Sequence, residues 1–233
     1  MHDLNRREVL RAGLVLGAGV VLAGCQSKAK AWKPLSEEEL SGPPRKPLAS
    51  GQPRQQPWAA SGPSGVISRR EWTTAGVITS LANPLNGVRR ITIHHSAMAS
   101  SHLRGKAEAA GMLEKIRRVH VGQQWADIGY HYIIDPSGRI WEGRPIQYQG
   151  AHVKLNNENN LGIMLMGNFE DERPSPEALS ALDSFVADRM RAYRVPITRV
   201  YTHKELMPTA CPGRALQRYM EETRSGNGRM ARA

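Results

Sequence analysis

The sequence predicts an α/β domain with a central mixed β-sheet flanked by helices, on the strength of three observations. Apolar residues alternate in several short segments, recur every three or four positions in two longer segments, and form one continuous run. These patterns begin near Val66 and persist to about Met220, which is enough chain for one domain. We therefore expect a single domain over residues 66–223, followed by a frayed tail at residues 224–233.

The expected strands are short. Residues 161–166 are continuously apolar, which is typical of a central strand buried on both faces. The turn-forming residues 135–138 predict a hairpin, because Asp, Pro, Ser and Gly favour tight turns. Alternating or β-branched segments predict the other strands, which are residues 90–94, 130–134, 139–142 and 198–202.

Two helices are expected between these strands. Residues 104–121 and 176–193 each place apolar side chains on one face of a helix. Ser175 followed by Pro176 is a plausible start for the second helix, since serine caps helices well and proline suits the first helical position.

The first 24 residues have the composition of a secretory signal peptide. Basic residues, including the pair Arg6 and Arg7, precede a short apolar stretch that ends in small residues. The sequence Leu22-Ala23-Gly24-Cys25 resembles the bacterial lipobox, which implies acylation of Cys25. The arginine pair also resembles a twin-arginine export signal. The alternative is a cytosolic helix with a buried Cys25.

Residues 25–65 are predicted to be a flexible linker. Prolines are concentrated there among Gly, Ser, Gln and charged residues, so the segment buries too little apolar surface to fold alone. We expect an exported lipoprotein of the bacterial cell envelope that faces the periplasm or cell wall, with a membrane anchor at Cys25. Gln26 resembles a sorting signal for an outer membrane.

The formal net charge of +11 favours polyanionic partners. Nucleic acid is not expected, because only 6% of residues are aromatic and can stack on bases. Anionic lipid and acidic wall polymers remain as candidate polyanionic partners.

Three residues near strand ends have the chemistry of a metal site. His94 and His203 each close a predicted strand, and Cys211 follows in a loop between Pro208 and Pro212. Two imidazoles and one thiolate suit zinc, and three protein ligands leave the fourth position for water. From spacing alone, structural histidines explain the pattern as well.

Motifs spread along the domain resemble the zinc amidases that include the peptidoglycan recognition proteins and a small phage amidase. They occur in family order and are Ser68–Trp72, Ile93–Ala97, Asp127–Tyr132, Arg139–Arg144, Gly150–His152, Asn160–Ile163, Met166–Asn168, Thr202–Glu205 and Thr209–Pro212. The resemblance implies hydrolysis of the amide bond between N-acetylmuramic acid and L-alanine in peptidoglycan or muropeptides, by a monomer.

The resemblance also implies residue roles. It makes His94, His203 and Cys211 ligands of Zn²⁺, Tyr130 catalytic, and His95 a packed or hydrogen-bonded neighbour of the site. The recycling amidases of the superfamily use an aspartate as third ligand and a carboxylate on the central strand, and neither occurs here.

Three further positions are candidates. Thr209 stands where the family places Thr or Lys, so it is catalytic or a loop hydroxyl bonded to its own backbone. His152 is either a substrate contact or a packed side chain. Arg144 is a candidate partner for stem-peptide carboxylates, with a solvated arginine as the default.

Two other functions remain open. A recognition module would keep this fold and bind peptidoglycan without cutting it, although such forms lack a zinc ligand and this chain retains all three and Tyr130. A zinc-storing or redox-sensing lipoprotein would need a resolving thiol near Cys211, which an acylated Cys25 does not supply.

Overall fold

The computed structural model describes residues 65–232. The predicted signal peptide, the predicted acylation site Cys25 and nearly all of the predicted linker lie outside this range. Within it, the chain folds around one six-stranded sheet with the order β1-β4-β3-β5-β2-β6. The predicted mixed sheet flanked by helices is therefore confirmed.

Five of the six strands lie close to the positions that the hydrophobic patterns predict, and the short strand at residues 66–67 was not predicted. Their bounds are β1 Val66–Ile67, β2 Arg90–His95, β3 Tyr132–Ile134, β4 Ile140–Glu142, β5 Asn160–Leu165 and β6 Val200–Thr202. Only β3 and β4 pair antiparallel, as the two arms of the predicted hairpin, and every other neighbouring pair is parallel. In the hairpin turn, the carboxylate of Asp135 accepts hydrogen bonds from the backbone N–H groups of Ser137 and Arg139.

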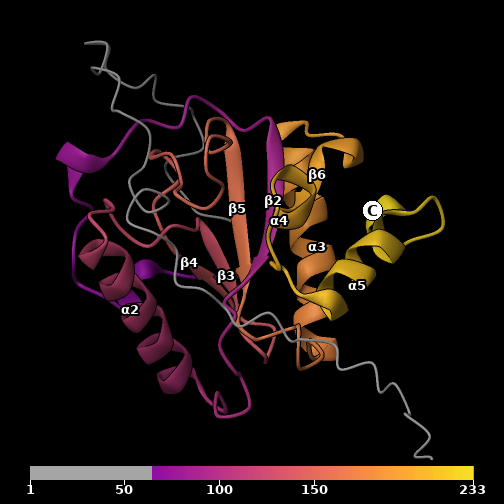
Figure 1. Ribbon diagram of the computed structural model, residues 1–233, viewed down its shortest axis with the longest axis horizontal. Helices are drawn as coiled ribbons and strands as arrows, with labels where there is room; N and C mark the ends of the chain where they lie inside the picture. Colours follow the sequence, from indigo (N-terminus) through magenta and orange to yellow (C-terminus); the bar gives the residue numbers. More distant parts are fainter. Residues whose placement is uncertain (1–64, 233) are drawn as a thin grey trace, which may run out of the picture.

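The helices cover both faces of the sheet. Their bounds are α2 Lys106–Gly122, α3 Pro176–Tyr193, α4 His203–Leu206 and α5 Arg214–Arg224, with short 3-10 turns at Arg69–Glu71, Thr79–Leu81, Ile197–Arg199 and Met230–Arg232. Figure 1 shows α2 on one side of the sheet and α3 with α5 on the other. The predicted cap of α3 is confirmed, because the Ser175 side chain accepts a hydrogen bond from Ala178 N–H and Pro176 begins the helix.

Alternation along the strands divides the core into two layers. Odd-numbered residues of β2 and β5, such as Ile93 and Ile163, pack with α3 and α5. Met164 on β5 and Ile133 on β3 pack with α2 on the opposite face. On this second face the strands also bury polar side chains, among them Thr92, His94 and Asn160. Polar groups buried on a sheet face need partners or a function.

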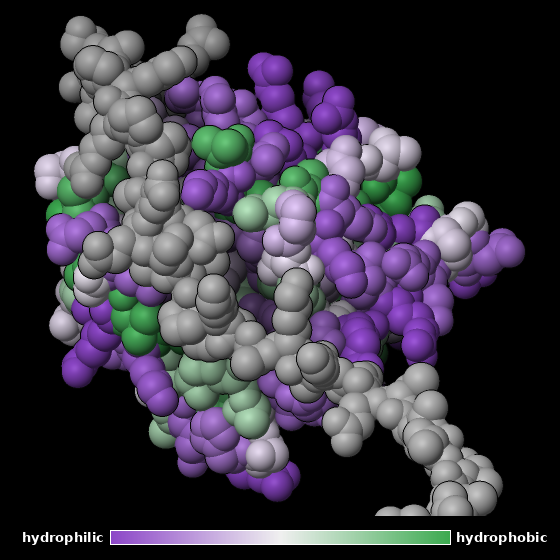
Figure 2. All heavy atoms as spheres, in the orientation of Figure 1, coloured by the Kyte–Doolittle hydropathy of each residue, from purple (hydrophilic) through white to green (hydrophobic). Residues whose placement is uncertain are grey.

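The outer surface in the view of Figure 2 is mainly hydrophilic, with hydrophobic residues scattered across it. Around α5 the exposed side chains are Arg214, Arg218, Glu221 and Glu222, so both charge signs are present. Within residues 65–232, none of the helices combines the length and apolar character that a membrane span requires.

The C-terminal end departs from the prediction. Residues 224–233 were expected to fray, yet Met230 is only 1% exposed and belongs to the core layer of α3 and α5. Arg224 forms an ion pair with Glu205, with 2.6 Å between nitrogen and oxygen. The tail through residue 232 is therefore part of the domain. The sequence of this tail is polar and contains glycine, so burial of Met230 was not expected from it.

Candidate metal centre

Parallel strand pairing places the two predicted histidine ligands side by side. Ile93 of β2 lies opposite Thr202, the last residue of β6, and His94 and His203 are the residues that follow them in the chain. Parallel strands run in register, so these next residues lie at the same level. The ring centroids are 4.7 Å apart. His203 is also the first residue of α4, whose start is held by a 2.7 Å hydrogen bond from Thr202 N–H to the Glu205 carboxylate.

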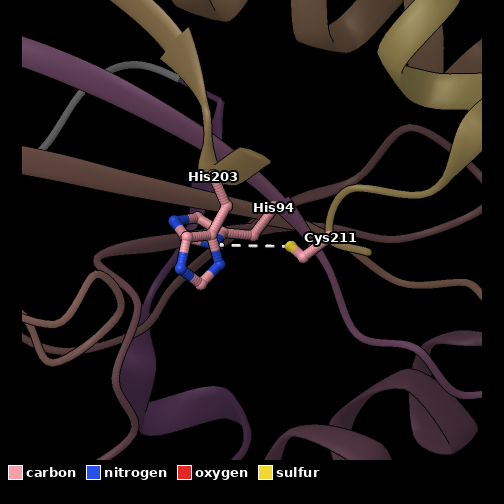
Figure 3. Close-up of side chains that lie close together, drawn as sticks. All are labelled: His94, His203 and Cys211. Atoms are coloured by element: carbon pink, nitrogen blue, oxygen red, sulfur yellow. Dashed lines mark hydrogen bonds between the residues drawn. The ribbon is translucent and has the colours of Figure 1, made fainter. Parts of the chain in front are cut away.

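The loop between α4 and α5 brings the thiol to the same place. Cys211 Sγ lies 3.6 Å from His94 Nδ1, the contact drawn in Figure 3. Gly213 fixes the loop against the neighbouring backbone, because a Cβ there would lie 2.4 Å from the carbonyl carbon of Phe169. One ligand atom from each of His94, His203 and Cys211 lies within 4.8 Å of the others.

The donor set of this cluster fits a zinc ion. Burial lowers the pKa of His94 well below its ordinary value and the pKa of His203 to about 4, so both imidazoles are neutral and keep a lone pair. Burial raises the pKa of the Cys211 thiol to about 12. His203 Nε2 is buried and has no hydrogen-bond partner among the described residues. An unsatisfied buried nitrogen is costly, and a cation at the cluster offsets that cost.

Tyr130 lies beside the cluster, two residues before β3. Its ring centroid is 5.2 Å from that of His94. Burial raises the pKa of the Tyr130 phenol above its ordinary value, and the nearby Cys211 raises it further. The phenol is therefore protonated at neutral pH and can donate a hydrogen bond. Within residues 65–232 no hydrogen-bond partner of the Tyr130 hydroxyl is present, so this donor is available to a bound molecule.

Thr209 lies two residues before the thiol, and its side chain is used locally. Its Oγ1 accepts a 3.2 Å hydrogen bond from the N–H of Cys211. This is the backbone-bonded arrangement that the sequence left open. The hydroxyl hydrogen is not consumed by the contact and is still able to donate.

Two other histidines near the site are occupied by backbone groups. His95 Nδ1 accepts from Phe169 N–H at 3.3 Å, which confirms the expectation that His95 is hydrogen-bonded within the fold. His120 Nδ1 accepts from Gly129 N–H at 3.0 Å, and its ring stacks on Trp125. Both are structural side chains.

His152 is buried directly behind a predicted ligand. It is 7% exposed, and its Nδ1 lies 3.0 Å from His94 Nε2, the ring nitrogen that faces away from Cys211. Of the two possibilities that the sequence left for His152, this placement favours an internal side chain over a substrate contact.

The structure contradicts both sequence-based interpretations of Arg144, as a partner for stem-peptide carboxylates and as a solvated arginine. Arg144 is 3% exposed, and its guanidinium donates to the carbonyl oxygens of Asp127, Ile128 and Gln149 at 2.7–2.9 Å. The buried ion pair between Asp127 and Arg69 lies next to it. Arg144 therefore joins loops of the fold, and its donors are not directed at solvent.

Comparison with known proteins agrees with this geometry. Residues 84–214 match the sequence pattern of the N-acetylmuramoyl-L-alanine amidase family, Amidase_2, over more than half of the chain. The chain belongs to this family. The matched region contains both histidines of the cluster, Tyr130 and Cys211.

Relatives of this amidase-family chain include animal and bacterial proteins. Peptidoglycan-recognition protein SD of Drosophila melanogaster is 30% identical over 169 residues, which cover 70% of this chain and 88% of that protein. The structure of peptidoglycan recognition protein-LE in complex with tracheal cytotoxin, a monomeric diaminopimelic acid-type peptidoglycan, has a TM-score of 0.59 at 28% identity and covers 65% of this chain and 89% of the other. The amidase LysC of Clostridium intestinale has a TM-score of 0.52 at 25% identity, covering 64% and 89%.

Some residues that organise this amidase-family site were not identified from the sequence. The Asn160 carbonyl and the ring of the buried His131 both contact His152, and Glu205 with Arg224 supports the start of α4. For Asn160 and His131, the sequence feature that could have identified them is the pair of glycines at positions 150 and 162. These glycines allow close packing around the His152 ring.

Proposed function

We propose that this chain is a zinc-dependent N-acetylmuramoyl-L-alanine amidase, which hydrolyses the amide bond between N-acetylmuramic acid and L-alanine in peptidoglycan. The observation that supports this most directly is the convergence of His94, His203 and Cys211 within 4.8 Å. A recognition module has no need for two neutral imidazoles and a thiol gathered at one point. Membership of the amidase family gives the substrate class.

In this proposal His94, His203 and Cys211 hold one zinc ion. When bound, zinc acidifies water and polarises a carbonyl oxygen, which is the chemistry that amide hydrolysis requires. The chain contributes two neutral imidazoles and one thiol, and it brings no carboxylate into the cluster. No serine nucleophile is needed.

Tyr130 is proposed as a hydrogen-bond donor to the oxygen of the reacting carbonyl as negative charge develops on it. Burial raises the pKa of its phenol, so in the metal-free chain the hydroxyl keeps its hydrogen and suits donation. Thr209 is a second donor from the loop that carries Cys211, because its hydroxyl hydrogen is not used by the backbone contact.

The test is release of new amino termini of L-alanine from purified peptidoglycan by the full chain, with zinc content measured on the same samples. Wild type is expected to hold about one zinc per chain and to cut. Cys211→Ala is expected to lose both zinc and activity. Tyr130→Phe should keep zinc and lose about 10²- to 10³-fold in kcat, as for other removed oxyanion donors.

His102→Ala is the matched control, because His102 is an exposed histidine outside the cluster and its loss should change neither zinc content nor rate. A wild-type chain that holds zinc and binds peptidoglycan without releasing amino termini would contradict the amidase proposal. That result would make the chain a recognition module.

A further inference from the structure

The imidazole of His152 occupies a site built for a ring of one shape. A Cβ on Gly150 would lie 2.4 Å from His152 Cδ2, and a Cβ on Gly162 would lie 2.6 Å from the same atom. Both distances are shorter than real contacts, so the ring fits only because both positions are glycine. The Asn157 side chain holds the backbone of this segment by accepting from His152 N–H at 2.8 Å.

The hydrogen bonds of this ring have a fixed direction. His152 Nε2 lies 3.2 Å from the carbonyl oxygen of Asn160, and a carbonyl oxygen only accepts. The hydrogen of the neutral His152 ring must therefore be on Nε2, which leaves a lone pair on Nδ1. That lone pair faces His94 Nε2 at 3.0 Å, so His94 must carry its own hydrogen on Nε2.

The consequence for His94 concerns its other nitrogen. A neutral imidazole carries one N–H, so a hydrogen on Nε2 leaves Nδ1 with the lone pair. His94 Nδ1 is the atom that faces Cys211 Sγ at 3.6 Å. The opposite tautomer would direct an N–H at the metal cluster and could not bind a cation there.

Among residues 65–232, His94 is the partner of the His152 Nδ1 lone pair, and the adjacent His131 does not compete for it. The adjacent His131 uses Nε2 to donate to Tyr148 O at 3.1 Å and Nδ1 to accept from Gly162 N–H at 3.0 Å. Its ring meets that of His152 edge to face, with centroids 5.9 Å apart. His131 therefore packs against His152 without changing the direction of its hydrogen bonds.

We propose that His152 is a positioning residue, which transmits the orientation of the Asn160 carbonyl to His94 and fixes the His94 tautomer that can bind metal through Nδ1. Partners that hold the second nitrogen of a metal-binding histidine are usually carboxylates, carbonyls or water. Here a second histidine is placed between the ligand and the carbonyl. The proposal rests on the proposed zinc site, but the tautomer itself is a property of the metal-free chain.

The experiment reads the tautomer and the zinc affinity separately. In the metal-free full chain, ¹⁵N chemical shifts of the histidine rings distinguish the two tautomers, and His94 is expected to carry its hydrogen on Nε2. His152→Phe removes the acceptor, so a mixture of His94 tautomers is expected, with zinc bound about 10- to 100-fold more weakly. His152→Gln keeps an acceptor and a donor in one side chain and should restore most of the affinity.

Phe185→Leu is the matched control for loss of packing, since Phe185 is buried in the opposite core layer and its change should leave tautomer and affinity unaltered. A wild-type His94 with its hydrogen on Nδ1 would overturn the proposal. So would a folded His152→Phe with unchanged tautomer and zinc affinity, or a Gln variant no better than Phe. If His152→Phe does not fold, the His94 tautomer and the zinc affinity of the wild type and of His152→Gln test the proposal. A chain with the expected tautomer and zinc affinity that fails to cut peptidoglycan would contradict the amidase proposal alone.

Discussion

At the scale of single residues, the site depends on two glycines, Gly150 and Gly162, as much as on the side chains that form it. The polar face of the sheet has room for His152 because two residues around it lack a Cβ. The ring in turn occupies the space behind His94. A change at either glycine therefore acts on the predicted ligand without touching it.

Gly162→Ala is expected to lower the free energy of unfolding by about 1 to 3 kcal/mol, as other overpacked core positions do, and to weaken zinc binding. The added Cβ would lie 2.6 Å from His152 Cδ2, so the ring must move away from His94. Urea unfolding and zinc titration measure the two effects.

Gly111→Ala is the control for this change, because Gly111 lies in α2 and a Cβ added there would meet no atom within 4 Å outside the helix backbone. It should raise the free energy of unfolding by roughly 0.5 to 1 kcal/mol, since alanine favours a helix over glycine. Equal stability of the two variants would contradict the packing argument at Gly162.

The sequence predicted residue chemistry better than residue burial. His94, His203 and Cys211 were selected as ligand types near strand ends, and the structure brings them together. Arg144 was misassigned because the sequence gives its charge, whereas its surroundings come from carbonyl groups that only folding gathers. His152 was left open for the same reason.

At the scale of secondary-structure elements, apolar periodicity and capping residues were sufficient to predict a helix that has a full apolar stripe. The second predicted helix matches α3, Pro176–Tyr193, in both bounds. Ser175 and Pro176 mark its start, and the apolar stripe continues to its end. Helix α5 was not predicted as a helix, since most of its residues are charged or polar. Its inward face is limited to Leu216, Met220 and Thr223, and this short stripe buries the helix against the core.

Ser175→Ala is expected to lower the free energy of unfolding by about 1 kcal/mol, and at most by 2 kcal/mol, through loss of the α3 cap. The Ser175 hydroxyl both accepts from Ala178 N–H and donates to Pro136 O at 2.5 Å, so it also joins α3 to the hairpin turn. Ser184→Ala is the control, because Ser184 is exposed and bonds only to the Ser180 carbonyl within α3. Urea unfolding that found equal losses would contradict the capping role.

Met230→Ala tests whether the C-terminal turn belongs to the domain. Loss of a side chain that is 1% exposed should lower the free energy of unfolding by about 2 to 4 kcal/mol. Arg232→Ala, at an exposed position in the same turn, should have no measurable effect. Unchanged stability in both variants would return residues 224–232 to the frayed tail that their composition suggested.

At the scale of the whole molecule, buried neutral histidines link stability to pH. Burial lowers the pKa of His120 to about 4 and that of His131 to about 3, against 6.5 for an ordinary histidine. Below pH 6.5 the unfolded chain takes up protons that the folded chain does not. Acid therefore favours unfolding from pH 6.5 down to those lowered values.

The free energy of unfolding of the metal-free chain should fall between pH 7 and pH 5, by on the order of 1 to 2 kcal/mol for each of these histidines. Urea unfolding at the two pH values measures the loss. His120→Gln keeps an acceptor for Gly129 N–H without a titrating ring, so the loss should be smaller in this variant. The same pH dependence in both chains would show that His120 does not contribute.

The parallel strand order has a consequence for how the chain assembles. Neighbouring strands β2 and β5 come from distant parts of the sequence, as the 68-residue separation of the bonded pair Thr92 and Asn160 illustrates. β6 adds to the other side of β2, and Cys211 comes later still. A growing chain emerging from the ribosome therefore holds His94 long before it has the strand, loop and thiol that complete the site. Long-range parallel pairing is slow, so the three proposed metal ligands meet only near the end of folding. If the proposed zinc site is correct, uptake of zinc reports completion of the fold.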